Sequence, residues 1–354
     1  MITDPIKGQG AQKNVANRFD KYSFDPEEDD AQEVRKTNFT EVFPKTIVNQ
    51  VKSPDLPMEY SLNPYQGCEH GCSYCFARPT HEYWGYSAGV DFERNIMFKK
   101  NAPELLEKFF KKRGYKPMPI LVSGNTDCYQ PAERKLEITR KLLQLFLDYR
   151  HPVNIITKNA LVLRDLDILK PLAEQNLVSV AISIPTINEE LRRLMEPRTS
   201  SSKNKIQAIE QLSRNGIPVH AMIAPVIPGL NSDEILNIMK VTSEAGALSA
   251  GASLVRLNDT VEPVFVEWIE TSFPDRKDKV LNLIRSMRGG NLGEKRFFNR
   301  YEGEGNIAEM IHNTIKIGKR KFFSNRERIV LDTSNFTGSK DQQLRLFLSC
   351  PEIG

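Results

Sequence analysis

The 354-residue sequence has no long apolar run near its start, and it has little net charge. Between Met1 and Lys7 it already contains an aspartate and a proline, so we predict neither a signal peptide nor a membrane-spanning segment there. Forty-nine basic against 45 acidic residues leave a formal charge of +4, which is too weak to predict nucleic-acid binding by itself. These absences favour a cytoplasmic globular protein without a membrane partner. The length allows one large domain or two ordinary ones.

Cysteine is also scarce, with five residues in the chain. An odd number without a secretory signal argues against a disulfide framework and favours a reducing compartment. Three of the five nevertheless fall within eight residues, as Cys68, Cys72 and Cys75, with Tyr74 just before the last. Three thiolates at this spacing can bind three corners of one cubane iron–sulfur cluster, which leaves the fourth iron free for a small molecule. The motif therefore predicts a metal centre that carries out chemistry.

Two other interpretations of this cysteine motif are open at this point. Buried free cysteines often pack as small hydrophobic residues, but this segment is polar and has no apolar periodicity. A zinc site with His70 or His81 as fourth ligand is the stronger rival, although structural zinc sites usually pair two close cysteines with two distant ligands. A zinc-stabilised binding protein and a passive iron–sulfur electron carrier are the corresponding non-enzymatic functions.

From residue 58 onward, short β-branched or apolar runs alternate with amphipathic stretches, a pattern typical of parallel βαβ units. Six such units with right-handed crossovers would close most of a barrel, and chemistry then lies at the carboxyl ends of the strands. We therefore predict an α/β fold, a partial parallel (β/α)6 TIM-like barrel, with the cysteines after its first strand. A capping box of Asn231 and Glu234 is expected to begin the helix that ends at Gly246. The expected strands cover residues 58–63, 120–122, 153–157, 177–184, 219–223 and 252–256.

The regions on either side of this alternation differ from it in composition. Residues 1–57 are polar and form an expected N-terminal arm, whose aromatic residues indicate that part of it wraps the main domain. Residues 58–256 form the expected core barrel. Residues 257–354 form an expected C-terminal extension, mostly helical, that covers the barrel mouth. Basic residues interleaved with Phe322 and Phe323 would suit a nucleic-acid groove, but the weak net charge favours a solvated basic face.

With these elements in place, the chain resembles the radical S-adenosylmethionine (SAM) superfamily. The mark of that superfamily is Cys-x3-Cys-x2-Cys with an aromatic before the third cysteine, and Cys68, Cys72, Tyr74 and Cys75 match it. The resemblance implies a [4Fe-4S] cluster on the three thiolates, with the methionyl amine and carboxylate of SAM on the fourth iron. It also implies reductive cleavage of SAM to a 5′-deoxyadenosyl radical, which abstracts a hydrogen atom from the substrate.

Within this superfamily, the chain is similar to the branch related to spore photoproduct lyase, often labelled DNA-repair-photolyase-like. More narrowly, it resembles a bacterial radical SAM family of unassigned function that is named from a Pseudomonas protein. The likeness spans most of the chain. The runs that carry the first likeness are 63–68, 126–133, 196–199 and 224–231, and those that carry the second are 8–12, 17–19, 331–333 and 341–344.

Two departures from that branch bear on the reaction. True spore lyases carry a cysteine hydrogen donor where this chain has Gly124, and this argues against reversal of a thymine dimer. Relatives usually have a proline where this chain has Cys128. Cys128 would lie near the barrel mouth, and it is a candidate hydrogen donor that quenches a substrate radical. A tolerated small residue in a loop is the simpler interpretation, because no activating neighbour is identified.

Polar residues at successive strand ends are the candidates for binding SAM. Ser123, Asn125, Thr126 and Asp127 follow the second expected strand and can hold the methionyl amine. Asp127 can equally cap the next helix. Lys158, after the third strand, can meet a carboxylate or be a solvated charge.

Three further candidates lie on or after later strands. Ser183 resembles the ribose-binding polar residue of the superfamily. Arg198 can clamp the SAM carboxylate through two hydrogen bonds, or it can form an ion pair with Glu196 or Glu190. Pro225 belongs to an apolar turn that resembles the segment on which the adenine rests, and closing the barrel is its structural alternative.

No second cluster motif is visible, because the remaining cysteines, Cys128 and Cys350, are isolated. An external one-electron donor such as flavodoxin or ferredoxin is therefore expected. The substrate stays open between a small molecule and a nucleic acid, and the runner-up function is nucleic-acid repair or modification. The reaction class is equally open, because substrate specificity lies in loops that the motif does not describe.

Overall fold

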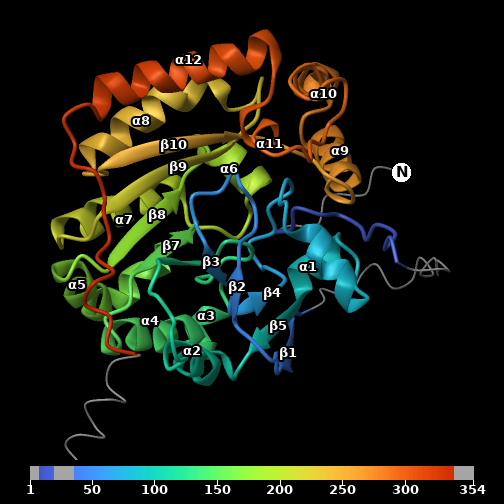
Figure 1. Cartoon of the computed structure of the whole chain (residues 1–354). Helices are drawn as coiled ribbons and strands as arrows, with labels where there is room; N and C mark the ends of the chain where they lie inside the picture. Colours follow the sequence, from blue (N-terminus) through green and yellow to red (C-terminus); the bar gives the residue numbers. More distant parts are fainter. Residues whose placement is uncertain (1–7, 20–35, 339–354) are drawn as a thin grey trace, which may run out of the picture.

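The core of the molecule is a curved, seven-stranded sheet (Figure 1). Its strands are β2 (Val48–Gln50), β3 (Tyr60–Leu62), β6 (Ile120–Val122), β7 (Val153–Thr157), β8 (Val178–Ser183), β9 (Val219–Val226) and β10 (Ser249–Leu254). They are ordered β10-β9-β8-β7-β6-β3-β2. From β3 to β10 all neighbours pair in parallel, and β2 adds an antiparallel edge. This computed structural model describes residues 8–19 and 36–338.

Helices follow the strands around the outer side of the sheet (Figure 1). The spacing of apolar residues explains their packing: α4 buries Ile138, Leu142 and Phe146, which lie four residues apart on one face. The α/β fold and the partial parallel (β/α)6 TIM-like barrel are thereby confirmed. In the described residues the edge strands β2 and β10 do not pair with each other, so the barrel is open. These helices are α2 (Ala102–Phe110), α4 (Ile138–Asp148), α5 (Leu166–Glu174), α7 (Ser202–Arg214) and α8 (Ile235–Glu244).

Five of the six expected strands lie where the sequence indicated, and the sixth is shifted. The strand expected at 252–256 begins at Ser249 and ends at Leu254. Pairing with β9, which sets Ser249 opposite His220, decides this register. Small residues such as Gly251 have weak strand propensity, so the sequence pattern placed the beginning of this strand at residue 252 instead of Ser249.

The expected capping box at the start of α8 is wrong. The Asn231 side chain instead accepts a hydrogen bond from the Ile227 N–H at 2.6 Å and donates to the Pro185 carbonyl at 2.8 Å. The Glu234 carboxylate accepts from the Thr186 hydroxyl at 2.5 Å. Both side chains therefore join the loops that follow β8 and β9, on the side of the sheet where the strands end.

The N-terminal region contributes strands as well as a covering segment. β1 (Asn38–Val42) belongs to a second sheet of order β1-β5-β4, together with β4 (Tyr65–Gln66) and β5 (Asn95–Lys99). β2 extends the main sheet itself. Residues before 58 are thus partly integrated with the barrel, because their backbone groups complete both sheets.

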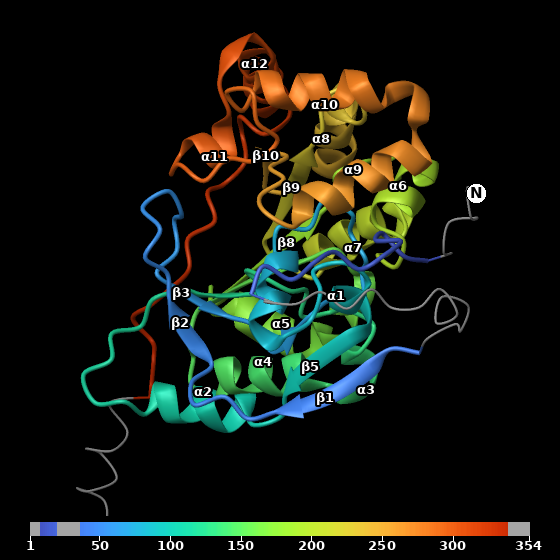
Figure 2. The same ribbon diagram turned by 90° about the vertical axis from the view of Figure 1, so that its right-hand side faces the viewer.

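The described part of the C-terminal region is largely helical, with α9 (Val261–Ser272), α10 (Lys277–Ser286), α11 (Asn299–Glu302) and α12 (Gly305–Phe322). α12 packs against α8 and β10. Figure 2 shows α11 beside the loop between β2 and β3, where Arg300 donates to Asp55 at 2.7 Å. The motif at 341–344 lies outside the described residues. No described helix has the length and apolar character needed to span a membrane.

Candidate active site

The three motif cysteines lie in a loop without regular secondary structure, residues 67–77, here called the cysteine loop. Backbone hydrogen bonds fix it to two other segments. The Cys68 N–H donates to the Phe92 carbonyl at 2.9 Å, and the Ser73 N–H donates to the Met195 carbonyl at 3.1 Å. The loop is therefore held from both sides by the protein itself.

The N-terminal segment, residues 8–19, packs directly on the cysteine loop. Gly10 lies so close to Gly71 that a Cβ atom at Gly10 would stand 1.8 Å from the Gly71 carbonyl oxygen. The N–H groups of Gly10 and Ala11 donate to the Glu93 carboxylate at 3.2 and 2.8 Å. This close approach explains why the segment carries glycine at that position.

Substituting Gly10 with alanine is expected to displace the N-terminal segment from the cysteine loop. The added methyl group has no space against a backbone carbonyl, and overpacking of this kind costs about 1–3 kcal/mol. Limited proteolysis should then cut residues 8–19 faster than in the unaltered protein. Gly124→Ala is the control, because its φ is not left-handed and the nearest atom to an added Cβ is the end of the Leu121 side chain at 3.3 Å. Equal cleavage of both variants would contradict the expectation.

Arg78 is fully buried beneath the cysteine loop. Its Nε and Nη2 atoms both donate to the Cys72 carbonyl, at 3.0 and 2.8 Å, and Nη1 donates to the Gly89 carbonyl at 2.9 Å. It also forms an ion pair with Glu93. Burial raises the pKa of the Cys75 thiol, and the Arg78 cation opposes that rise. Arg78 thus fixes the loop backbone and supplies positive charge next to the thiols.

The three thiols fit a metal cluster in which each thiolate binds a different metal ion. Burial and the Glu196 carboxylate raise the pKa of Cys72 well above its usual value, whereas Lys158 opposes the rise, and Cys75 and Cys68 add smaller repulsions. Cations of a cluster would favour the three thiolates at once. No three His, Cys, Asp or Glu side chains of the described residues are grouped to hold a single ion. The thiolates of a cubane bind separate irons, so such a grouping is not needed for it.

His70 connects the cysteine loop to the ends of β6 and β7. Its Nδ1 lies 3.4 Å from Asp127 Oδ2, and its Nε2 lies 3.3 Å from Asn159 Nδ2. Although burial opposes it, Asp127 and then Cys68 raise the pKa of His70 to about 10. Asp127 also accepts the Lys158 N–H at 2.8 Å. Polar contacts of His70 and Asp127 therefore join the cysteine loop to the ends of β6 and β7.

Glu196 is the centre of a second buried network. The Tyr74 hydroxyl donates to Glu196 Oε1, and the Lys205 ammonium donates to Oε2 at 2.7 Å. Lys158 Nζ lies 4.0 Å from Oε1. Burial alone would raise the pKa of Glu196, but Lys205 and Lys158 hold it below its usual range. The network joins the aromatic residue of the cysteine motif to α7 and to the end of β7.

A pocket of about 220 Å³ lies beside the cysteine loop, where several strands of the barrel end. Chemistry in barrels of this kind occurs at those ends. Predicted site residues that line this pocket are Tyr74, Lys158, Ser183 and Pro225. Further lining side chains are Phe76, Ile156, Met222, Leu254, Val255, Arg256 and Tyr301.

The predicted residues just after β6 are used in the turn and do not line the pocket. The Ser123 hydroxyl accepts from the Cys128 N–H at 2.7 Å and donates to the Thr126 carbonyl at 2.8 Å. The Thr126 hydroxyl donates to the Tyr65 carbonyl at 2.6 Å. Both hydroxyls therefore have structural partners.

Asp127 and Asn125 also have partners within the fold. Asp127 accepts the Tyr129 N–H and the Thr157 hydroxyl, both at 2.8 Å, so it closes a turn and does not cap the next helix, α3 (Glu133–Leu136), whose N-cap residue is Ala132. The Asn125 N–H donates to the Asn63 side chain at 2.8 Å. These contacts order the loops at the strand ends. Asp127 and Asn125 therefore support the loops next to the pocket and do not line it.

Arg198 and Cys128 lie away from the contacts expected of them. Arg198 Nε donates to the Gly8 carbonyl at 3.0 Å, and its N–H donates to the His70 carbonyl at 3.3 Å. Arg198 therefore ties the N-terminal segment to the cysteine loop, whereas Glu196 pairs with lysines. Cys128 is fully buried in the hydrophobic core, and burial raises its thiol pKa well above the usual value. Neither residue lines the pocket.

Several pocket residues were missed in the sequence. Phe76 directly follows the cysteine motif, and Arg256 ends the segment that was expected as the sixth strand. The rule that favours strand-end polar residues would have found Arg256 if the last strand had been included. Tyr301 lies in the C-terminal region and has no local signal, because only tertiary contacts bring α11 to the barrel.

A family model described as the radical SAM superfamily matches residues 62–242. The class of protein follows from this match together with two structural features. These are the cysteine loop at the end of β3 and β4 and the open parallel barrel. The chain belongs to the radical SAM superfamily and is an enzyme of that superfamily. Membership of this enzyme superfamily argues against the two non-enzymatic alternatives, a zinc-stabilised binding protein and a passive electron carrier.

Two uncharacterised proteins illustrate how far the similarity extends. One, from Mycobacterium tuberculosis, is 30% identical over 250 residues, which cover 70% of this chain and 74% of that protein. The other, from Methanocaldococcus jannaschii, is 28% identical over 282 residues, covering 79% and 94%. Spore photoproduct lyase in complex with a dinucleoside spore photoproduct is a similar solved structure, with a TM-score of 0.59 and 16% identity over 81% of this chain and 80% of that chain. The fold is thus like that of spore photoproduct lyase.

Proposed function

We propose that Cys68, Cys72 and Cys75 hold a [4Fe-4S] cluster and that the adjoining pocket binds SAM. The observation that carries this proposal is that Tyr74 of the cysteine loop and Lys158 of the β7 end line one cavity. When bound, the two cofactors supply a 5′-deoxyadenosyl radical by one-electron cleavage of SAM, and this radical takes a hydrogen atom from the substrate.

The residues of the chain bind and orient SAM in this proposal. Lys158 donates to the carboxylate, and Asp127 positions it by accepting its backbone N–H at 2.8 Å. The Ser183 hydroxyl, which donates to the Ala224 carbonyl at 3.3 Å, serves the ribose. Pro225 offers apolar surface to the adenine. Ser183 is buried and Lys158 and Pro225 are partly buried, which limits the access of water and strengthens each polar contact.

Anaerobic reconstitution with iron and sulfide tests the proposal. We expect about four irons per chain and formation of 5′-deoxyadenosine from SAM when a strong reductant, flavodoxin or ferredoxin supplies electrons. Deuterium that moves from a candidate substrate into 5′-deoxyadenosine would identify the hydrogen donor. Fully loaded protein that forms no 5′-deoxyadenosine would refute the proposal.

Substituting Lys158 with methionine is expected to weaken SAM binding. The variant keeps the apolar stem but loses a charge-assisted hydrogen bond worth about 1.5–3 kcal/mol, so the Kd should rise roughly 10- to 100-fold. Equilibrium dialysis with labelled SAM on cluster-loaded protein measures the change. Lys141→Met, which removes an exposed lysine of α4, should bind as the unaltered protein does. An unchanged Kd for Lys158→Met would exclude the assigned role.

A second candidate function is repair or modification of nucleic acid. It is supported by the fold shared with spore photoproduct lyase and by three aromatic rings, Phe76, Phe297 and Phe298, that are 51%, 50% and 55% exposed. Exposed rings on such surfaces stack with unpaired bases. Tight, salt-sensitive binding of oligonucleotides would favour this function, and no binding at low salt would rule it out.

A further inference from the structure

Arg256 lies just beyond the end of β10 and lines the pocket beside the cysteine loop. Its guanidinium carbon is 5.3 Å from the ring centre of Phe76 and 4.7 Å from that of Tyr301. Cation–π contacts with two rings fix the plane of the guanidinium. Because the rings contact the faces of the guanidinium, its N–H groups, which lie in its plane, are left for other partners.

Those N–H groups are unused in the part of the chain that the structure describes. Arg256 forms neither a hydrogen bond nor an ion pair there, and its contacts are the two rings. An arginine carries five N–H donors in a fixed fork that matches the oxygens of a carboxylate or phosphate. A pocket wall with an oriented and unpaired fork is therefore suited to an oxyanion.

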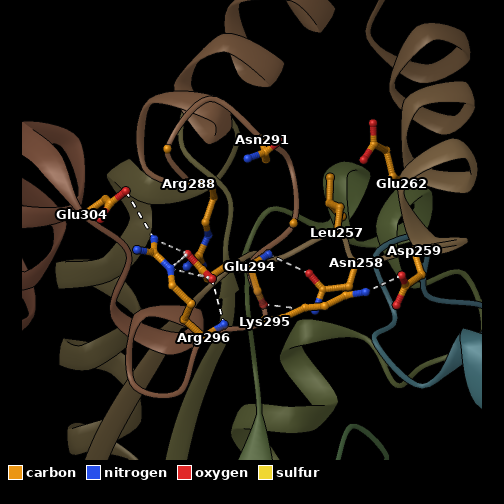
Figure 3. A pocket seen from close by; sticks show the side chains of 12 residues that line it. Leu257, Asn258, Asp259, Glu262, Arg288, Asn291, Glu294, Lys295, Arg296 and Glu304 are labelled. Atoms are coloured by element: carbon orange, nitrogen blue, oxygen red, sulfur yellow. Dashed lines mark hydrogen bonds and ion pairs between the residues drawn. The ribbon is translucent and has the colours of Figure 1, made fainter.

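Cations of the C-terminal region differ from Arg256 in being paired. Figure 3 shows a separate pocket of that region, in which Arg296 is directed at Glu294, with Nη2 at 2.6 Å, and Lys295 is directed at Asp259 at 2.7 Å. Arg300 on α11 is likewise held, because it donates to a buried aspartate of the β2–β3 loop. These three cations have acidic partners, whereas Arg256 has none among the described residues.

A second guanidinium strengthens the local positive potential. Arg288 is buried and donates to the carbonyls of Leu254 and Val255 at 3.2 and 2.8 Å, and to that of Asn299 at 2.6 Å. Burial lowers the pKa of Arg288 to about 10, Glu294 opposes this, and the nearby Arg256 charge lowers it further. These hydrogen bonds of Arg288 also join the backbone next to Arg256 to the C-terminal region, and they hold the backbone that positions the Arg256 guanidinium.

We propose that Arg256, clamped between Phe76 and Tyr301, binds a carboxylate or phosphate group of the substrate. The inference rests on the proposed function and names the substrate class for the same pocket: a compound with one oxyanion close to the hydrogen atom that is removed. Lys158 is assigned to SAM, whereas Arg256 stands between Phe76, which is 51% exposed, and Tyr301. Because Lys295, Arg296 and Arg300 of the C-terminal region already have acidic partners, a polyanion finds few additional partners there, which favours a substrate with a single anionic group.

Calorimetric titration of the cluster- and SAM-loaded protein tests this assignment. Phenyl phosphate, benzoate and the neutral benzyl alcohol are suitable probes, because they share a ring and differ in the charged group. We expect an anionic probe to bind at least about 10-fold more tightly than benzyl alcohol, and Arg256→Gln to lose that advantage. The tighter of phenyl phosphate and benzoate shows which oxyanion is preferred. Equal binding of the neutral and anionic probes would overturn the proposal.

Two controls separate recognition from folding. Arg320→Gln removes an exposed arginine of α12 and should bind the probes as the unaltered protein does, whereas Arg256→Lys should be intermediate because it keeps the charge without the fork. The same loss in Arg320→Gln and Arg256→Gln would contradict the assignment. In the unaltered protein, phenylglyoxal should modify Arg256, and the bound anion should slow this reaction, as mapped by mass spectrometry. An unchanged rate also contradicts it.

Failure of this inference can be told apart from failure of the proposed function. If the unaltered protein forms 5′-deoxyadenosine but shows no anion preference, the assignment of Arg256 is wrong and the radical chemistry stands. If the anion protects Arg256 but loaded protein forms no 5′-deoxyadenosine, the anion site stands and the radical proposal is wrong.

Discussion

Replacing Cys72 with alanine is expected to reduce bound iron from about four per chain to nearly none and to lower 5′-deoxyadenosine formation by at least roughly a thousand-fold, since no other source of the radical exists in the proposal. Two remaining thiolates leave two irons without protein ligands. The loop backbone should persist, because Arg78 bonds to the carbonyl of residue 72 and not to its thiol. Iron analysis and product quantification under anaerobic conditions measure both effects.

Cys128→Ala is the matched control, because it makes the same chemical change at a core residue outside the pocket. We expect it to keep its iron and its 5′-deoxyadenosine formation. Retention of full iron by Cys72→Ala would disprove the ligand assignment. Bound zinc in place of iron, in protein reconstituted with both metals, would return support to the zinc interpretation.

Replacing Lys205 with methionine is expected to lower the free energy of unfolding by about 3–5 kcal/mol. Lys205 and Glu196 have side chains that are 1% and 0% exposed, and their charged atoms are 2.7 Å apart. Removing the lysine leaves a buried carboxylate with Tyr74 as donor and Lys158 at 4.0 Å. Loss of one partner from a buried pair is costly, because the remaining charge has lost its water as well as its partner.

Urea denaturation of samples with equal metal content measures this loss, provided that the m-values agree. The double variant Glu196→Gln with Lys205→Met should be more stable than Lys205→Met alone, because the fully buried side chain at residue 196 is then neutral. Arg214→Met breaks an exposed pair with Glu210 and should cost no more than about 1 kcal/mol. A similar cost for the buried and exposed pairs would show that the Glu196 network contributes little.

Much of the barrel was predictable because its signals are local. Runs such as 153–157 alternate buried and half-buried residues, and this alternation is visible in the amino-acid types. The strand at Ser249 was predicted less well, since its small residues carry little propensity and the neighbouring strand decides its register. Asn231 and Glu234 match a capping pattern, yet Asn231 donates to the Pro185 carbonyl and Glu234 accepts from the Thr186 hydroxyl, both in the loop after β8.

The pocket was predictable in part for a related reason. Lys158 and Ser183 lie at strand ends, and parallel strands bring such ends together. Arg198 follows a strand by a longer connection, and it lies instead against Gly8. No strand-end rule describes that contact, because it joins segments 190 residues apart in the chain.

By itself, the sequence predicted the metal-binding cysteine motif and determined the order of strands and helices. The spacing of Cys68, Cys72 and Cys75 is short enough that the chain geometry alone keeps the thiols together, and apolar periodicity sets each element locally. Only the tertiary structure decided that Gly10 supports the cysteine loop and that Arg256 stands between two rings without an acidic partner among the described residues. These arrangements depend on which distant segments meet and on which charges already have partners, and neither is encoded in a local pattern.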